Sequence, residues 1–493
     1  MSGRSYQLAG RDSTGVFLGL DAADCILVAT GFAVTIGARL AGVPVLLSGL
    51  PLVLATVMAK GAIAGKSVHE WLRLSVAWSV SHVVGRHRWR RPLPLLPTAD
   101  GRSPILPPAL DGLDVVAGPD VGGMAIVRDP RRARLTAVLA VRAHRFTGAD
   151  PAAQDALLAR WGDVLASQAT ASTGVVQVGW THTATPTALD EHRRWSRDRL
   201  TGTAVDQVSS SEPYDALIDE VAATASRHDS FVWVTVSGRD IAGRGRPLDR
   251  AVAHLPTVVT GMADLLADAG VLVDAPLTVP ELWRLLRRRC DPTHPAGDVD
   301  QPPVSLAARM GVVAPTTVGP LAIDVDWARM HVDGSWHRVY WVESWPRRPV
   351  PADWLAGFLA GFESTTMTVV HRPVDPARSQ RRIDSQLVKL GAHLARKEDR
   401  ARRVTEVERR VQQAAEDLES EIASGFAETL YLGLVCLSAP TAEDLDARGH
   451  DLEQAARASQ LGLRLLHGRQ DTAWAATLPF GLADPSVLDL VAP

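Results

Sequence analysis

Lysine is almost absent from this 493-residue chain, which carries it only at Lys60, Lys66, Lys389 and Lys397 and otherwise relies on arginine for positive charge. Its 52 basic side chains are balanced by 55 acidic ones, so the formal net charge is only −3. A chain built to coat nucleic acid would be strongly basic. Bulk charge therefore does not favour a dedicated DNA-binding protein.

Cysteine and the sequence signatures of catalysis are also scarce. Cys25, Cys290 and Cys436 lie far apart, outside any C-x-x-C pair, which indicates neither a disulfide framework nor a zinc site. No G-x-S-x-G, H-E-x-x-H or aspartate-rich metal loop occurs. Residues 61–67 resemble a phosphate-binding loop, but Lys60 stands where its first glycine is required. We therefore expect neither enzymatic activity nor a cofactor.

What the chain does contain is a long apolar region near its amino terminus, at residues 22–64. A helix needs roughly 20 residues to cross about 30 Å of hydrocarbon. Residues 43–64 reach that length and residues 22–38 fall slightly short, so we predict a transmembrane helical hairpin over residues 22–66. Small residues at four-residue spacing are expected to bring its two helices together: Ala29, Ala33 and Gly37 on the first, Ala55 and Ala59 on the second.

Basic residues on both sides of the hairpin predict its orientation. They precede residue 22 and crowd the segment after residue 65, whereas the turn holds only Arg39. The positive-inside rule then places both termini in the cytoplasm and the protein in the cytoplasmic (inner) membrane, behind a cytoplasmic tail of residues 1–21. The apolar region is too long for a cleaved signal peptide. The alternative is a hairpin buried in a soluble protein.

Residues 67–91 follow with an S-x-x-E helix start and a basic end. An amphipathic helix directly after a membrane segment is suited to the lipid interface; the alternative is a helix packed on the folded body. The candidate interfacial residues are Trp71, Trp78, Arg86, Arg88, Arg90 and Arg91. Proline-rich residues 92–108 are expected to be a linker.

The remainder alternates between short β-rich runs and helical periods, which predicts α+β domains of the ferredoxin-like type. The first domain is placed at residues 109–300, with strands near 123–127, 135–141, 174–179 and 231–236 and helices near 152–168, 214–228, 256–269 and 279–290. Pro256 is expected at the first position of its helix.

A second α+β domain is placed at residues 301–375 and 426–493. Its strands are expected near 321–325, 337–343, 366–371, 429–437 and 461–466, with a helix at 441–459. The tryptophan-rich strand should be half-buried. Trp341 and Trp345 are candidate interaction residues if that strand is a ligand platform, although aromatic strand residues usually belong to a core.

A long charged helical insertion is predicted between the two parts of this domain, at residues 376–425. Val404, Val407, Val411 and Leu418 follow three- and four-residue steps that favour a helical hairpin. The arginines at Arg400, Arg402 and Arg403 suit a solvated face, with contact to a partner or nucleic acid as the alternative.

Four stretches together resemble a family of actinobacterial membrane proteins of conjugative, type IV secretion-like systems. They are residues 67–71 after the hairpin, the basic residues 85–91, the strand at 339–347 and the ending at 471–479. In that family the hairpin is similar to the small membrane subunit, and the rest is similar to the amino-terminal half of the motor ATPase.

The resemblance implies a non-catalytic inner-membrane scaffold that docks a separate ATPase. Its expected partners are the lipid bilayer, that ATPase and other membrane subunits of the secretion complex, and its expected state is an oligomer. Two alternatives are a membrane component of type VII secretion and an arginine-rich membrane protein that binds nucleic acid.

Overall fold

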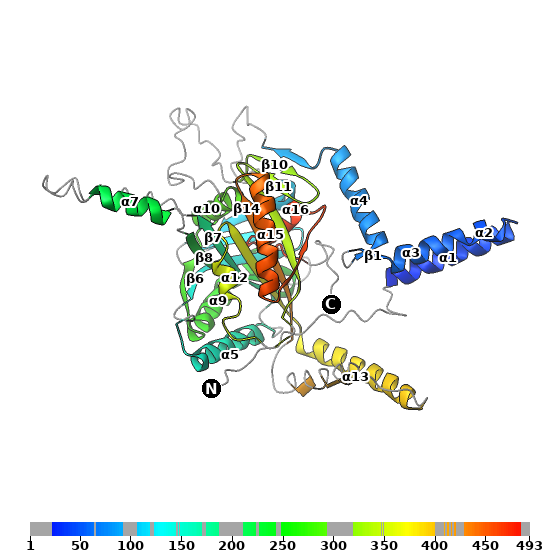
Figure 1. The fold of residues 1–493 in the computed structure, drawn as a ribbon. Helices are drawn as coiled ribbons and strands as arrows, with labels where there is room; N and C mark the ends of the chain where they lie inside the picture. The colour runs from blue at the N-terminus through cyan, green and yellow to red at the C-terminus, as the bar shows by residue number, and fades with distance from the viewer. Residues whose placement is uncertain are drawn as a thin grey trace.

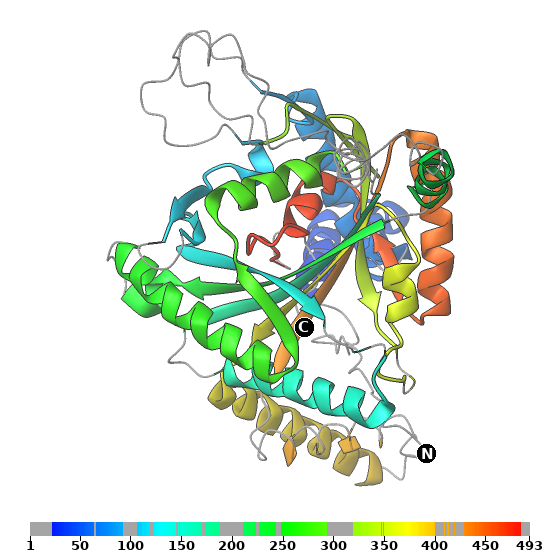
Figure 2. The same cartoon turned by 90° about the vertical axis from the view of Figure 1, so that its left-hand side faces the viewer.

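A computed structural model describes residues 22–63, 66–91, 106–118, 123–143, 146, 148–169, 174–186, 211–222, 226–242, 248–292, 319–346, 348, 350–399 and 428–484, with isolated positions between 409 and 420. Most of its strands belong to one antiparallel sheet of 13 strands, with helices on both faces (Figures 1 and 2). The prediction of a mixed α+β protein is thus confirmed.

One half of the sheet is a β-α-β-β-α-β unit in which the strands lie in the order β9-β6-β8-β7, each antiparallel to its neighbour. Strands β5 and β4 continue the sheet beyond β6. The elements are β4 (Asp114–Ala117), β5 (Ala125–Asp129), β6 (Arg134–Ala143), α5 (Pro151–Ser167), β7 (Val175–Pro186), β8 (Ser226–Ser237), α9 (Asp249–Asp268) and β9 (Val271–Pro276).

The other half repeats the same connectivity, with the order β15-β12-β14-β13. Strands β11, β10 and β3 extend this half on the side of β12. The elements are β3 (Arg88–Arg90), β10 (Ala322–Val325), β11 (Met330–Val332), β12 (Ser335–Ser344), α12 (Ala356–Ala360), β13 (Thr365–Pro373), β14 (Thr429–Ala439), α15 (Ala442–Ala458) and β15 (Gly462–Leu465).

The two halves join through the edge strands β7 and β13, which pair from Thr365↔Ala184 to His371↔Val178. Threonine hydroxyls tie the pair on one face: Thr181 to Thr368 and Thr183 to Thr366, each at 3.1 Å. An edge strand alone would leave its backbone donors and acceptors unpaired. The pairing removes that exposure and makes a single sheet of the two predicted domains.

Helix α16 (Gln470–Ala476) and the chain after it lie across this junction (Figure 2, red). Gln177 of β7 donates to the Ala483 carbonyl at 2.8 Å, and Thr368 of β13 donates to the Thr477 carbonyl at 2.8 Å. Gln470 also accepts from the backbone N–H of Val339 at 2.8 Å. The carboxy-terminal segment thus bonds to both halves of the sheet.

Helices cover the sheet on both faces. Helices α5 and α9 pack on the first half and α12 and α15 on the second, while α10 (Val279–Cys290) and α16 cover the opposite face. Strand β12 is therefore buried on both sides: Trp341 faces α16, and Tyr340 faces α15. The prediction that this strand is half-buried was wrong, because its polar residues His337 and Arg338 are also buried.

Several element boundaries differ from the predictions. Pro256 lies inside α9, which begins at Asp249; a buried stripe of Ala251, Leu255 and Val259 runs through it, and this packing offsets the cost of an interior proline. The helix expected over 214–228 ends at Ala222, as α7 (Ser211–Ala222), and β8 starts at Ser226. Strand β3 comes from the segment expected to be wholly helical.

The amino-terminal region forms a helical hairpin that projects from the body (Figure 1). Its elements are α1 (Ala22–Leu40), α2 (Val45–Ser48) and α3 (Leu50–Lys60), followed by β1 (Ala62–Ile63), β2 (Lys66–Ser67) and α4 (Val68–Val83). Among the described residues, no helix combines the length and apolar character needed to cross a bilayer. The predicted second span is broken at Gly49 and stops at Lys60.

The packing face of the hairpin also differs from the prediction. Ala55 and Ala59 of α3 are buried as expected, but Ala29, Ala33 and Gly37 lie on the exposed side of α1. Gly31 makes the close approach instead: a Cβ there would lie 2.5 Å from the Ala55 Cβ. The three small residues with four-residue spacing therefore lie on a different face of α1 from the one that contacts α3.

The remaining described elements are the short helices η1 (Pro108–Leu110) and α8 (Gly238–Ala242) and the long helix α13 (Pro376–Asp399). Most of the predicted insertion after residue 399, including the expected valine seam, lies outside the described residues.

Replacing Gln470 tests the bonds of the carboxy-terminal segment. Its side chain is fully buried and also donates to the Leu466 carbonyl at 2.7 Å. Gln470→Leu leaves the Val339 N–H without its acceptor, so we expect a loss of about 1–3 kcal/mol in unfolding free energy, measured by urea denaturation. Gln380→Leu on α13 is the control and should change stability by less than about 0.5 kcal/mol. Equal effects of the two variants would contradict this role for Gln470.

Candidate functional site

The outside of the α1–α3 hairpin is an unusual surface, because its apolar side chains face away from the protein. Leu46 is 90% exposed and Leu40 85% exposed. The other exposed large apolar residues are Ile26, Phe32, Val34, Ile36, Val45, Leu47, Leu50, Val53, Leu54 and Val57. Contiguous apolar surface of this kind marks a site of contact with membrane or protein.

Polar side chains within the hairpin bond to its own backbone. The hydroxyls of Thr30, Thr35 and Thr56 donate to carbonyls four residues earlier, at 2.8, 2.9 and 2.8 Å. At the turn, Arg39 donates to the Val43 carbonyl at 3.2 Å. The hairpin therefore carries few polar groups that require water.

Helix α4 connects the hairpin to the body and has two distinct faces. Its outer face carries exposed Leu72, Val76, Val80 and Val83, spaced by three or four residues. The inner face packs on the body through Trp71 and Trp78, whose rings lie 6.2 and 5.4 Å from that of Trp327. The helix was expected either to lie at the lipid interface or to pack on the folded body. Its aromatic residues pack on the body, and an apolar stripe faces outward.

The aromatic cluster at the base of α4 includes Trp71, Trp78, Trp327 and His467. Gly468 makes room for it with a φ of +68°, and a Cβ there would lie 2.8 Å from the Trp327 ring. Trp327 and His467 come from the β10–β11 turn and the end of β15, so sequence reasoning missed them. Their aromatic character was visible, but their nearness to α4 was not.

A polar side-chain contact joins α4 to α1. Asp24 is buried at the start of α1, and its carboxylate lies 3.2 Å from Nδ1 of His69. This contact joins two elements of the hairpin base close to the body. This contact helps to fix the orientation of the hairpin relative to α4, and the aromatic cluster fixes α4 relative to the sheet.

The predicted interfacial arginines lie along β3, at the rim of the sheet. Arg88 and Arg90 are exposed and pair with Asp324 of β10 at 3.6 and 2.7 Å. Arg86 is exposed, and Arg91 is partly buried, which lowers the pKa of its guanidinium. These cations follow the carboxy-terminal end of α4, whereas the hairpin joins its amino-terminal end (Figure 1).

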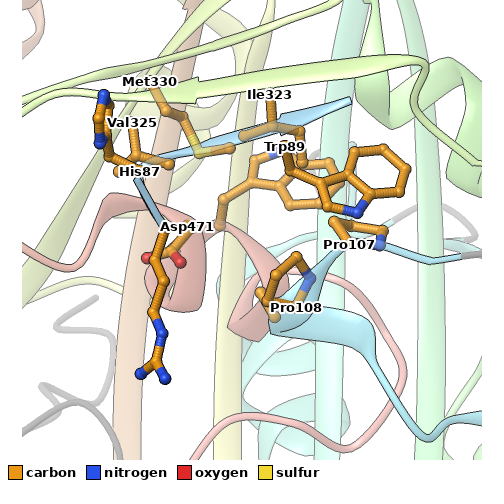
Figure 3. A pocket seen from close by; sticks show the side chains of 11 residues that line it. His87, Trp89, Pro107, Pro108, Ile323, Val325, Met330 and Asp471 are labelled. Carbon is orange, nitrogen blue, oxygen red and sulfur yellow. The ribbon is translucent and has the colours of Figure 1, made fainter. Parts of the chain in front are cut away.

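A recess of about 310 Å³, including space open to solvent, lies beside β3 (Figure 3). Asp471 projects from α16 at the same side as His87, and Trp89 and Pro107 line the other side. Burial raises the pKa of the Asp471 carboxyl, although a bond from Thr472 at 3.4 Å opposes the shift. The stretches 85–91 and 471–479, far apart in sequence, thus meet at one place.

The other predicted interaction residues lie elsewhere. Trp341 is buried, and the Arg464 guanidinium lies 5.1 Å from its ring centroid; Trp345 packs on Trp354 and Tyr431. Arg400, Arg402 and Arg403 lie outside the described residues. The two tryptophans therefore contribute to packing and form no open platform.

Buried ionisable groups in the body serve the core. His337 bonds to the Ser438 hydroxyl at 2.8 Å and faces the Cys290 carbonyl at 3.1 Å, and burial lowers its pKa to about 3. Burial raises the pKa of the Cys436 thiol, so it stays protonated and unreactive. The described part of the chain contains no group of three or more residues able to hold a metal ion.

The partly buried carboxyl of Asp471 is expected to make stability depend on pH. Its folded-state pKa lies above the ordinary 3.8, so the folded state disfavours the charged form, and wild-type stability should fall as pH rises through that folded pKa. We expect Asp471→Asn to raise the urea midpoint at pH 7.5 and to lose this advantage near pH 4. Exposed Asp451→Asn is the control. An Asp471→Asn variant less stable than wild type at pH 7.5 would contradict this role of Asp471.

The site thus combines an exposed apolar hairpin, a basic sheet rim and a small recess, all joined through α4. Comparison with models of known protein families gives no match, and no curated protein sequence matches the chain.

Proposed function

We propose that this protein is a non-catalytic scaffold held at the cytoplasmic membrane by its hairpin, within a conjugation or type IV-like secretion complex. The observation that carries the proposal is the exposed apolar surface of α1–α3, which continues on the outer face of α4. At roughly 25 cal/mol per Å² of apolar area, moving this surface out of water is strongly favourable. In this proposal a lipid bilayer covers the apolar surface of the hairpin.

The geometry of the hairpin suits insertion from one side of the membrane. Helix α1, with 19 residues, is about 28 Å long, and the returning arm is interrupted at Gly49. The hairpin would enter from the cytoplasmic side and return to it, so both termini stay cytoplasmic. Helical backbone and self-bonded threonines suit this setting, because unsatisfied polar groups are costly in hydrocarbon.

Charge after the carboxy-terminal end of α4 supports the same orientation. Arg86, Arg88 and Arg90 are exposed close to where α4 ends, and basic residues near the surface gain about 1 kcal/mol each from anionic lipids. Asp324 neutralises part of this charge. The basic rim would therefore add modestly to binding that is chiefly apolar.

The body behind the hairpin is proposed as the docking part. We interpret its two β-α-β-β-α-β units as paired ferredoxin-like domains. In the secretion family that the sequence resembles, a region of this kind accompanies a motor ATPase. By that resemblance, the body would bind a separate ATPase polypeptide, together with other membrane subunits in an oligomer.

Membrane attachment is tested by making the hairpin tip polar. We expect the full-length protein to remain with membranes after carbonate washing, and Leu46→Asp with Leu47→Asp to release most of it, because charged residues inside a bilayer cost at least about 2–3 kcal/mol each. Val388→Asp, an exposed position on α13, is the control. Equal retention of the two proteins would refute attachment through the hairpin. Maleimide labelling of an Ala41→Cys, Cys25→Ser variant from either side would show how deep the turn lies.

The partner is tested by purifying the tag-bearing protein from native membranes in mild detergent. We expect a phosphate-loop ATPase to co-purify, whereas the purified chain alone should hydrolyse no nucleotide. Recovery of a type VII secretion ATPase would favour that alternative. Intrinsic hydrolysis, or recovery of nucleic acid in place of an ATPase, would contradict the scaffold role.

A further inference from the structure

Strands β7 and β8 extend beyond the apolar core, and their far ends carry a cluster of polar side chains. On β8, Val232, Val234 and Val236 pack in the core, and the same alternation places Ser230, His228 and Ser226 next on that face. His182 on β7 is paired directly with Ser230. Two imidazoles and two hydroxyls thus share one face of a hydrogen-bonded strand pair.

The distances within this cluster connect all four groups. Nε2 of His182 lies 3.2 Å from Nδ1 of His228. The outer nitrogens each meet a serine: Nδ1 of His182 lies 2.9 Å from the Ser230 hydroxyl, and Nε2 of His228 lies 2.9 Å from the Ser226 hydroxyl. In each ring, one nitrogen therefore faces the other imidazole and the second nitrogen faces a serine hydroxyl.

This arrangement has the form of a chelating pair. Two imidazole nitrogens bound about 2.0–2.1 Å from a tetrahedral ion lie roughly 3.3–3.4 Å apart, close to the 3.2 Å observed. In metal sites the second nitrogen of a ligating histidine usually donates to a neighbouring group, which fixes the tautomer. Ser226 and Ser230 stand where such acceptors are needed.

We propose that His182 and His228 bind a divalent late transition-metal ion such as Zn²⁺ or Cu²⁺. Nε2 of His182 and Nδ1 of His228 are the protein ligands, and the serines hold the outer N–H groups. Because the described residues supply no third ligand here, water or a donor from another molecule completes the coordination. This assignment is independent of the membrane scaffold proposal.

The hydrogen bonds of the pair can rearrange around a bound ion. Without an ion, one of the two facing nitrogens, Nε2 of His182 or Nδ1 of His228, carries the proton between the rings. With an ion bound, that proton moves to the outer nitrogen of the same ring, and the serine hydroxyl beside that nitrogen accepts it.

The test is a titration of tag-free, full-length protein with Cu²⁺ and Zn²⁺ by calorimetry. We expect a site that both His182→Gln and His228→Gln weaken at least tenfold, with Cu²⁺ bound more tightly than Zn²⁺, as the Irving–Williams order requires, and no binding of Mg²⁺. His450→Gln, on the exposed side of α15, is the control. Unchanged affinity in both cluster variants, or binding weaker than millimolar in wild type, would overturn the proposal.

Two further measurements guard against misfolded variants. Ser226→Ala with Ser230→Ala keeps both ligands and should weaken the site about 10–100-fold, while the midpoint of urea denaturation stays unchanged. Zinc K-edge absorption of the loaded wild type should show two histidine nitrogens near 2.0 Å. A spectrum with only water or carboxylate oxygens around the ion would exclude the pair.

Discussion

The pairing of β7 with β13 is the interaction on which the rest of the body depends. It converts two β-α-β-β-α-β units into one sheet, and it creates the junction over which the carboxy-terminal segment lies. That segment bonds to Gln177 on one side and Thr368 on the other, in a region where the buried surface is polar. Buried hydroxyls and amides of this kind need hydrogen-bond partners. The carbonyls of the carboxy-terminal segment supply partners for the side chains at the junction, and those side chains hold the segment in place.

The same segment links the core to the base of the hairpin. Gln470 bonds to β12, while Asp471, the next residue, lines the recess beside β3. Strand β3 ends the chain section that carries α4, and α4 is held to the body by the tryptophan cluster and to α1 by Asp24 and His69. A continuous series of side-chain contacts therefore runs from the sheet junction to the apolar hairpin.

Much of the fold could be predicted from periodicity. The strands β5, β6, β12, β13 and β14 and the helices α5, α10 and α15 lie close to their expected positions, because strongly patterned segments form the same element in many contexts. The misses have physical causes. The short strands β3, β4 and β11 carry little pattern. Pro256 lies inside α9 because the packing of that helix offsets the cost of an interior proline. On α1, the four-residue spacing predicted a helix contact at Ala29, Ala33 and Gly37, whereas Gly31 makes the close approach to α3.

The sequence by itself determined that the chain is mixed α+β, that its amino-terminal region is apolar, and that no known catalytic signature is present, since each follows from local pattern or residue type. Only the tertiary structure decided which apolar residues stay exposed, that β12 is buried on both faces, and that Arg86, Trp89 and Asp471 share a recess. It also brought His182 and His228 together. These features depend on contacts between residues distant along the chain, and the register and direction of strands that set those contacts are not encoded in any one segment.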